Sequence, residues 1–354
     1  MKLHENQLSL IRHLTRFNYL DYEHCLKKLE TEDMTDVIAL SYAFRPLTKN
    51  NYISKNNDGI VSVLRKGRAL FPEEKPLISS GWNDRYRIIQ ISRMAALMER
   101  NGVTITDKLP QNENPHFIPS PCWRNIAPGI LSTTRFVGML LAYGKKYAVY
   151  DIGDGRVEWQ VRAESSLFYT KYGSYETKAD GMILICDDDK RKEVAEYIIR
   201  QTMWNRKSLL SESYTERERP VRFSRSPIKL RTQYEHVYLT TPAMLHTSLS
   251  RIYDEERLMN SIIAKNTPTN DPKIGDFEQW PCRYFINSTY DLLKLVYFFS
   301  AVKMLEADDS DYQSSKLKYG IIMHKKDLPI VRMYEDVFRS KKVIFCEFTP
   351  DENS

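Results

Sequence analysis

The sequence predicts a mixed α/β protein, in which a small N-terminal domain of helices and a β-hairpin precedes a larger domain built on a mixed sheet. Three observations support this prediction. Residues 5–68 contain three segments with helical periodicity, followed by two short β-rich runs. Residues 105–131 are rich in proline, and from residue 132 onward strand-like and helix-like patterns alternate. A chain of 354 residues has room for about two to three domains. We therefore expect domains at 1–104 and 132–354, joined by a linker at 105–131.

The first two helices are indicated by apolar residues that recur at helical spacing. The first covers Glu5–Arg16, and a break is expected at Phe17–Leu20. The second covers Asp21–Leu29, because Asp21 is placed to cap its start and apolar side chains follow on one face.

The third helix covers Thr35–Phe44, with Asp33 or Thr35 placed to cap its start. We expect it to end or kink at Phe44–Arg45, because Pro46 cannot continue a regular helix. Its apolar residues are Val37, Ile38, Leu40, Tyr42 and Phe44. We assign Tyr42 to the core.

A β-hairpin follows the third helix. The β-rich runs Asn51–Ser54 and Gly59–Leu64 are joined by Lys55–Asp58, and the Asn-Asp-Gly sequence that ends this connection is typical of tight turns. Three helices followed by a hairpin is the order of winged-helix domains, which place a helix in the major groove of DNA and rest the hairpin on phosphates. The segment therefore favours binding to double-stranded DNA, and contacts with another protein remain the alternative.

Charge supports the same interpretation. The net charge is +6 and the pI is about 8.8, but six Lys or Arg residues stand against one acid between Arg45 and Arg68. Such a cluster indicates an anionic partner, with Lys and Arg contacting phosphates and Asn reading adenine edges. The candidate DNA contacts are Arg45, Lys49, Asn50, Asn51, Lys55, Asn56, Asn57, Arg65, Lys66 and Arg68.

A second basic segment lies between Asn205 and Arg231, where eight Lys or Arg residues stand against three acids. It lacks helical periodicity and contains two prolines, so a solvated charged loop competes with a second nucleic-acid contact. The residues of this second patch are Arg217, Arg219, Arg222, Arg225, Lys229 and Arg231.

A helix is expected at Asp84–Asn101, because its apolar residues repeat at helical spacing and Gly102 follows in the stop position. Its apolar face is wide. We expect it to pack on the N-terminal domain, and packing on a second copy in a homodimer is left open.

The larger domain is predicted from apolar runs that alternate with helical patterns, which indicates a mixed sheet with helices on its faces. The expected strands are Phe136–Ala142, Tyr147–Ile152, Val157–Val161, Ala179–Cys186, His236–Thr240, Tyr319–His324 and Val343–Phe348. The expected helices are Lys190–Thr202, Pro242–Tyr253, Thr289–Leu305 and Leu328–Arg339.

Nuclease chemistry is the enzymatic alternative. Asp151, Glu158 and Asp180 are acids that can hold Mg²⁺, but the lysine that usually accompanies such carboxylates is missing from the pattern. No phosphate-binding loop, dinucleotide motif or zinc-ligand spacing occurs in the sequence. We therefore expect no cofactor, with Mg²⁺ needed only if the protein is a nuclease or nickase.

The compartment is expected to be the cytoplasm, with no membrane contact. The five cysteines are scattered and include no Cys-x-x-Cys pair, and no apolar run reaches the ~18 residues of a membrane span.

Three segments carry a resemblance to a known family: "LIRHLTRFNYLDYEHCLKKL", "SVLRKGRALF" and "TTRFVGMLLAYGKKYAVYDIGDGRVEW". In the order of its parts the chain resembles the replication–relaxation family, proteins of plasmids and integrative conjugative elements in Gram-positive bacteria. The resemblance implies a winged-helix head, a nuclease-like α/β body, and a role in replication, transfer or their regulation alongside replication or conjugation proteins. It carries over no catalytic residue, because the body lacks an intact set of metal ligands and lysine.

Overall fold

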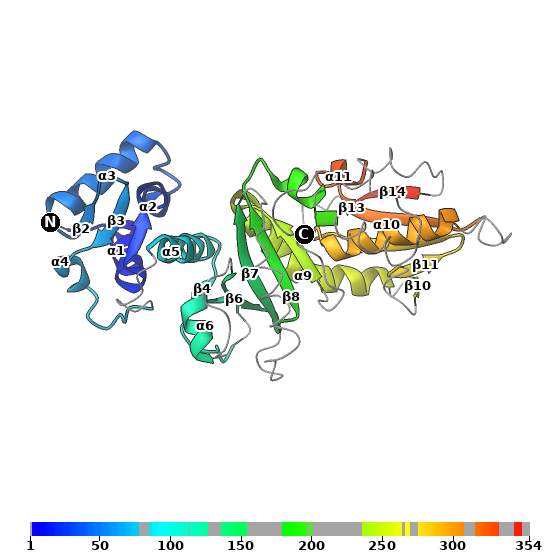
Figure 1. Cartoon of the computed structure of the whole chain (residues 1–354), viewed down its shortest axis with the longest axis horizontal. Coiled ribbons are helices and arrows are strands. Elements are labelled where there is room, and N and C mark those ends of the chain that lie inside the picture. The colour runs from blue at the N-terminus through cyan, green and yellow to red at the C-terminus, as the bar shows by residue number, and fades with distance from the viewer. Residues whose placement is uncertain are drawn as a thin grey trace, which may run out of the picture. The chain divides into compact units, whose positions relative to one another are not determined.

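A computed structural model describes residues 2–77, 85–112, 114–126, 136–153, 179–196, 198–199, 236–263, 266–269, 275–307, 316–332 and 343–348. These residues form a mixed α/β protein with three sheets (Figure 1). The chain divides into two compact units. The first comprises Met1–Leu131 and Phe136–Lys146, and the second comprises Ser132–Arg135 and Tyr147–Ser354.

The first unit opens with three helices and a small antiparallel sheet. The elements in order are α1 (Glu5–Phe17), β1 (Tyr19–Asp21), α2 (Tyr22–Leu29), α3 (Val37–Lys49), β2 (Ile53–Lys55) and β3 (Ile60–Val63). The sheet order is β1-β3-β2. The three helices and the hairpin lie where the sequence predicts them, but the predicted break at Phe17–Leu20 contains most of a strand, because Tyr19–Asp21 pairs with β3.

One stripe of α3 packs into the core of these elements. Leu40, Phe44 and Leu47 lie at spacings of four and three residues, and all three are buried against α1, α2 and the hairpin. The hairpin contributes its own inward-facing side chains, Ile53, Val61 and Val63. The buried stripe of α3 therefore fixes which face of this helix remains outside.

Three predictions about α3 were wrong. Asp36, rather than Asp33 or Thr35, caps the helix by accepting from the Ala39 N–H at 3.0 Å. The helix also does not end at Phe44–Arg45 but continues through Pro46 to Lys49, where the Lys66 ammonium donates to the backbone carbonyl of Asn50 and holds the helix end. Tyr42, assigned to the core, is exposed.

Two further helices complete the helical part of the first unit. They are α4 (Arg65–Arg68) and α5 (Arg85–Arg100). As predicted, α5 packs on the N-terminal elements, where it contacts β1, α1 and α2. Gly102 follows it with φ +76°, a backbone conformation that favours glycine.

The expected linker at 105–131 is not free of structure. It contains β5 (His116–Pro119) and α6 (Ser120–Ile126), preceded by β4 (Thr104–Ile105). Phe117, Ile118 and Trp123 are fully buried, because β5 pairs with β6 (Phe136–Ala142) and α6 packs on both strands. Burial of its apolar side chains therefore gives this segment regular secondary structure despite its prolines.

The second unit holds further strands of a six-stranded sheet, whose order is β4-β5-β6-β7-β8-β9. These are β7 (Lys145–Gly153), β8 (Gly181–Cys186) and β9 (His236–Thr240), followed by the short helix η2 (Pro242–Met244) and by α9 (Leu245–Ile263). β7, β8 and β9 pair in parallel, as expected for strands joined by crossovers. Val157–Val161 and most of the predicted helix after Lys190 lie outside the described residues.

A five-stranded sheet of order β10-β11-β12-β13-β14 follows in the second unit. Its elements are β10 (Thr267–Pro268), β11 (Phe277–Gln279), β12 (Cys282–Asn287), α10 (Leu292–Ala307), β13 (Lys318–His324), α11 (Pro329–Arg332) and β14 (Val343–Phe348). The sequence predicts β13, β14 and α10, but β11 and β12 were missed. Those two strands mix polar with apolar residues and are short.

Among the described helices, none combines the length and the apolar character that crossing a lipid bilayer requires.

Candidate functional site

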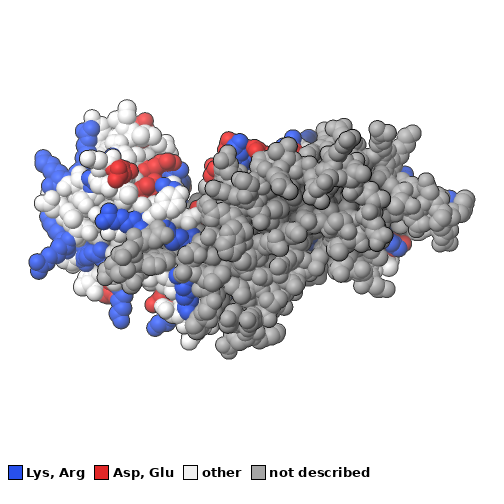
Figure 2. Space-filling view, in the orientation of Figure 1, with Lys and Arg blue, Asp and Glu red and all other residues white. Residues whose placement is uncertain are grey.

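Five exposed cations lie at the end of α3, in the hairpin and in α4. We call this set the basic surface: Arg45, Lys49, Lys55, Arg65 and Lys66. Figure 2 shows Lys and Arg side chains gathered along the edge of the first unit where α3 ends and α4 lies. Within the described residues, none of the five is paired with a carboxylate. All five are therefore available to an anionic partner.

Contacts between α4 and the end of α3 bring these cations together. The ammonium of Lys66 donates to the backbone carbonyl of Asn50, the residue that ends α3, at 3.0 Å. Gly67 lies directly beneath the Tyr52 carbonyl, where a Cβ atom would overlap it. This close approach requires glycine and holds α4 against the start of the hairpin.

The hairpin turn is built by its own side chain and backbone. The Asn56 Oδ1 atom accepts from the Ile60 N–H at 2.7 Å, and the Asn56 N–H donates to the Ile60 carbonyl at 2.9 Å. Gly59 supplies the positive φ of +76° that the turn needs. Asn56 therefore builds the turn, Asn57 is exposed within it, and Asn51 is exposed at the other end of the hairpin, just after α3.

Three cations of the basic surface lie over tyrosine rings. Arg45 lies 4.8 Å from the ring centre of Tyr42, Lys55 lies 3.5 Å from that of Tyr22, and Lys66 lies 4.5 Å from that of Tyr52. Each contact at an exposed site is worth about 0.5–1 kcal/mol. The rings therefore orient the cations without neutralising them.

Two of the ten candidate contacts have internal roles instead. Arg68 donates to the Asn18 Oδ1 atom at 2.7 Å and to the Thr15 carbonyl at 3.5 Å, so it fastens α4 to the end of α1. The Asn50 amide donates to the Pro46 carbonyl at 2.8 Å and closes the end of α3. Both side chains are only half-exposed. Arg68 and Asn50 therefore do not belong to the basic surface.

The opposite end of α3 is acidic. Glu30, Glu32, Asp33 and Asp36 precede the helix, and no Lys or Arg lies among them. Glu30 pairs with Arg100 at 2.8 Å and Asp36 caps the helix, whereas Glu32 and Asp33 are exposed. Phosphates are therefore attracted to the end of α3 and repelled from its start.

Large apolar side chains are exposed between these two ends. Val37, Ile38 and Tyr42 keep 63%, 67% and 61% of their surface. Sequence reasoning missed this exposed face because α3 carries two apolar stripes. No local signal separates them, because Ile38 and Tyr42 are spaced four residues apart just as Leu40 and Phe44 are.

The two candidate catalytic acids that the structure describes, Asp151 and Asp180, lie apart. In the parallel register, Gly181 pairs with Tyr147 and Ile185 pairs with Asp151. Asp180 therefore lies at the start of this strand pair and Asp151 near its end, about 16 Å apart along the strands. Glu158 and the second basic patch lie outside the described residues. Among those that are described, no three metal-binding side chains come together.

A buried chain of polar groups in the first unit resembles a hydrolase triad. His13 lies between Ser92 and Glu99, with its Nε2 atom 3.0 Å from the Ser92 hydroxyl and its Nδ1 atom 3.0 Å from the Glu99 carboxylate. Ser92 is completely buried, and Lys28 also binds Glu99, at 2.7 Å. A substrate has no access to this hydroxyl, so the chain is structural.

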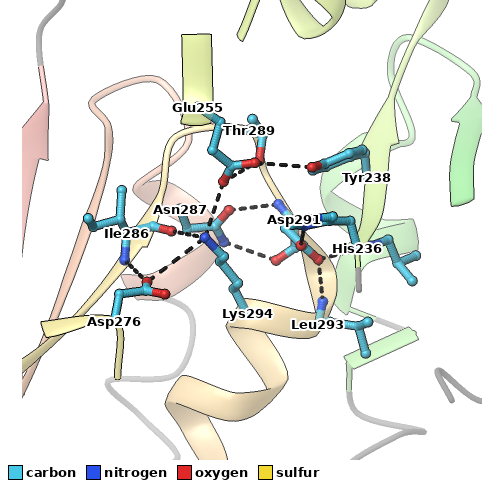
Figure 3. Close-up of polar contacts among 11 residues, drawn as sticks. His236, Tyr238, Glu255, Asp276, Ile286, Asn287, Thr289, Asp291, Leu293 and Lys294 are labelled. Carbon is cyan, nitrogen blue, oxygen red and sulfur yellow. Dashed lines mark hydrogen bonds and ion pairs between the residues drawn. The ribbon is translucent and has the colours of Figure 1, made fainter. Parts of the chain in front are cut away.

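A second buried cluster, in the second unit, is centred on Lys294 (Figure 3). Its ammonium lies 3.2 Å from Glu255 and 3.9 Å from Asp276, and it donates to the Ile286 carbonyl at 2.9 Å. Burial lowers the pKa of Lys294, but the carboxylates of Glu255 and Asp276 reverse this and hold its pKa above the ordinary value. Two carboxylates and a lysine are the groups of a metal-dependent nuclease, yet the ammonium itself lies against these carboxylates.

Asp291 extends this cluster to β9. Its carboxylate lies 3.0 Å from the His236 Nδ1 atom and accepts the backbone N–H groups of Val237 and Leu293. Burial raises the pKa of Asp291, but His236 outweighs that effect and the pKa lies below the ordinary value. Figure 3 shows these bonds linking β9 to the segment that opens α10. They position the two elements against each other.

A pocket of about 270 Å³ lies beside Asp327 in the second unit. Asp327 is fully buried and pairs with Arg191 at 2.9 Å and Arg251 at 2.8 Å. Asp188, which also lines the pocket, accepts the Ala243 N–H at 3.0 Å. The buried carboxylate at this pocket is therefore neutralised by two arginines, one of which, Arg191, also lines it.

Comparison of the chain with protein-family models, with curated proteins and with solved structures finds no significant match.

Proposed function

We propose that the first unit contains a winged-helix domain and that the protein binds double-stranded DNA in a sequence-directed way. The observation that carries this proposal is the basic surface, because five exposed cations from α3, the hairpin and α4 lie around one exposed helix face. The sheet order β1-β3-β2 with α3 packed on it supports the assignment of the domain. In such an arrangement α3 enters the major groove and the hairpin contacts phosphates.

The biological setting follows from the resemblance to replication–relaxation proteins. We propose that the protein acts on the DNA of a plasmid or conjugative element, in replication, transfer or their regulation. Its partners would then be DNA and the replication or conjugation proteins of that element. The second unit would supply contacts to such proteins or to a second copy.

The test is a triple variant of the basic surface, Arg45→Ala/Lys55→Ala/Arg65→Ala, in a titration of duplex DNA at several salt concentrations. Each lost phosphate contact lowers the slope of log affinity against log salt by about one, so the slope should fall by about three. Affinity at physiological salt should fall by about ten-fold or more. The matched control, Lys27→Ala/Arg100→Ala/Lys108→Ala, removes three exposed cations elsewhere in the first unit and should change neither value greatly. Equal binding by the two triple variants would contradict the proposal.

A protein-interaction module is the second candidate, and the exposed apolar face of α3 favours it. Exposed side chains such as Val37 and Ile38 often mark protein contacts. In that case the unaltered protein would bind no duplex, even at low salt.

A further inference from the structure

The exposed apolar face of α3 is concentrated rather than scattered. In the described part of the chain eight large apolar side chains are classed as exposed, and three of them lie within the six positions from Val37 to Tyr42. Packing of α3 does not require these three apolar side chains, because Leu40, Phe44 and Leu47 already supply the buried stripe of the helix. The exposed residues are therefore free to contact a partner.

Two of these apolar side chains share one face of α3 with the cations. Ile38 and Tyr42 are followed at helical spacing by Arg45 and Lys49, and Val37 is exposed beside Ile38 in the first turn. The ring of Tyr42 lies against the Arg45 guanidinium, which makes the two groups continuous. A partner for this face must therefore present apolar groups at one end and negative charge at the other.

We propose that Val37, Ile38 and Tyr42 contact the 5-methyl groups of thymine in the major groove, so that the domain selects sequences containing A·T pairs. This inference rests on the proposed function. The major groove combines the two features required, because phosphates line its edges and the thymine methyl projects from its floor. Apolar side chains on a recognition helix discriminate this methyl from the groups of the other bases.

The acidic segment before α3 agrees with this placement. Glu32 and Asp33 are exposed and repel phosphates. We therefore expect the start of α3 to lie above the bases and its end to lie above the phosphate backbone. Parallel pairing of α3 with a second copy is unfavourable, because it would bring two sets of these carboxylates together. The charge pattern therefore disfavours that arrangement of two copies.

The experiment uses the full chain and a duplex that it recovers from a random-sequence pool. That duplex is synthesised with thymine and again with uracil at each thymine position, which removes only the 5-methyl group. Burial of one methyl group is worth about a four-fold change in affinity, so uracil should weaken binding by about four-fold at each contacted position. The variant Val37→Ala/Ile38→Ala/Tyr42→Ala should bind the two duplexes equally. Leu109→Ala, which shortens an exposed apolar side chain outside α3, should keep the preference for thymine.

Each other outcome has a distinct meaning. Equal binding of the thymine and uracil duplexes by the unaltered protein, or recovery of no preferred sequence, would overturn the inference and leave DNA binding intact. A thymine preference that survives in Val37→Ala/Ile38→Ala/Tyr42→Ala would overturn the assignment of these residues. Failure of the unaltered protein to bind any duplex would overturn the proposed function itself.

Discussion

The Nδ1 atom of His13 lies 3.0 Å from a carboxylate oxygen of Glu99, and this bond joins α1 to α5 within the first unit. Because a carboxylate only accepts, Nδ1 carries the proton and Nε2 accepts from the Ser92 hydroxyl. Lys28 donates to the same carboxylate at 2.7 Å, and its side chain is only 5% exposed. Every member of this chain therefore depends on Glu99 remaining charged.

Replacing Glu99 should destabilise the first unit strongly. Glu99→Gln leaves the buried ammonium of Lys28 without an opposite charge, which costs about 3–5 kcal/mol. Urea unfolding followed by circular dichroism measures the loss. The matched control is Glu23→Gln, whose partner Lys27 is half-exposed, and it should cost at most about 0.5 kcal/mol. Equal losses in the two variants would contradict a structural role for the buried chain.

Stability of the first unit should fall as the pH drops below 6.5. Burial lowers the pKa of His13 below its ordinary value of 6.5, so the unfolded chain binds this proton first and acid favours unfolding. A second loss begins below about pH 4.5, because His13 and Lys28 outweigh burial and hold the pKa of Glu99 below its ordinary value. Unfolding free energies measured across this range should show both steps. In His13→Asn the upper step should disappear, and its persistence would assign it to another group.

Loss of Lys294 should cost more stability at high pH than at low pH. Lys294→Met leaves the buried carboxylates of Glu255 and Asp276 without their cation, which costs about 3–5 kcal/mol near pH 8. Burial already raises the pKa of Asp276, and without the ammonium it rises further. A raised pKa means that stability present at low pH is lost as the pH rises, so the deficit should shrink near about pH 5.

The control for this pH dependence is Lys325→Met, which removes an exposed lysine 4.0 Å from Glu347. That change should alter the unfolding free energy by at most about 0.5 kcal/mol at either pH. A deficit in Lys294→Met that does not vary with pH would show that lost packing, rather than charge, determines its stability.

Gly67→Ala should weaken both folding and DNA binding. The new Cβ atom would overlap the Tyr52 carbonyl and lie 2.9 Å from a methyl group of Val63, so α4 must shift. Overpacking of this kind costs about 1–3 kcal/mol. Because Arg65 and Lys66 move with α4, duplex affinity should also fall. Ala69→Ser, a small change at an exposed position beside α4, should leave both measurements unchanged. Unchanged affinity in Gly67→Ala would place α4 outside the interface.

Long apolar runs were predicted well because a continuous apolar run of this length, rich in β-branched and aromatic residues, favours a strand. Phe136–Ala142 and Val343–Phe348 form strands with the predicted bounds. Tyr19–Asp21 was missed because three residues carry no period, and this strand exists only through its pairing with β3. Non-local pairing of this kind leaves little trace in a short sequence.

The candidate site could be predicted only in part. Eight of the ten candidate contacts are exposed, because composition identifies charged and amide side chains that favour solvent. Arg68 turns inward to Asn18, a residue 50 positions earlier, and no local pattern contains that contact. Similarly, Val37 and Leu40 are both apolar, and only the assembled core decides that one is exposed and the other buried.

Because of Pro46, the last turn of α3 depends on bonds from Asn50 and from α4. Proline has no amide hydrogen, so the Tyr42 carbonyl lacks its usual bond from four residues ahead. The turn beyond it is secured by Asn50, which bonds back to the Pro46 carbonyl, and by Lys66 of α4. Amide hydrogens at the end of α3 should therefore exchange with solvent at a rate that α4 controls, independently of the helix's first turns.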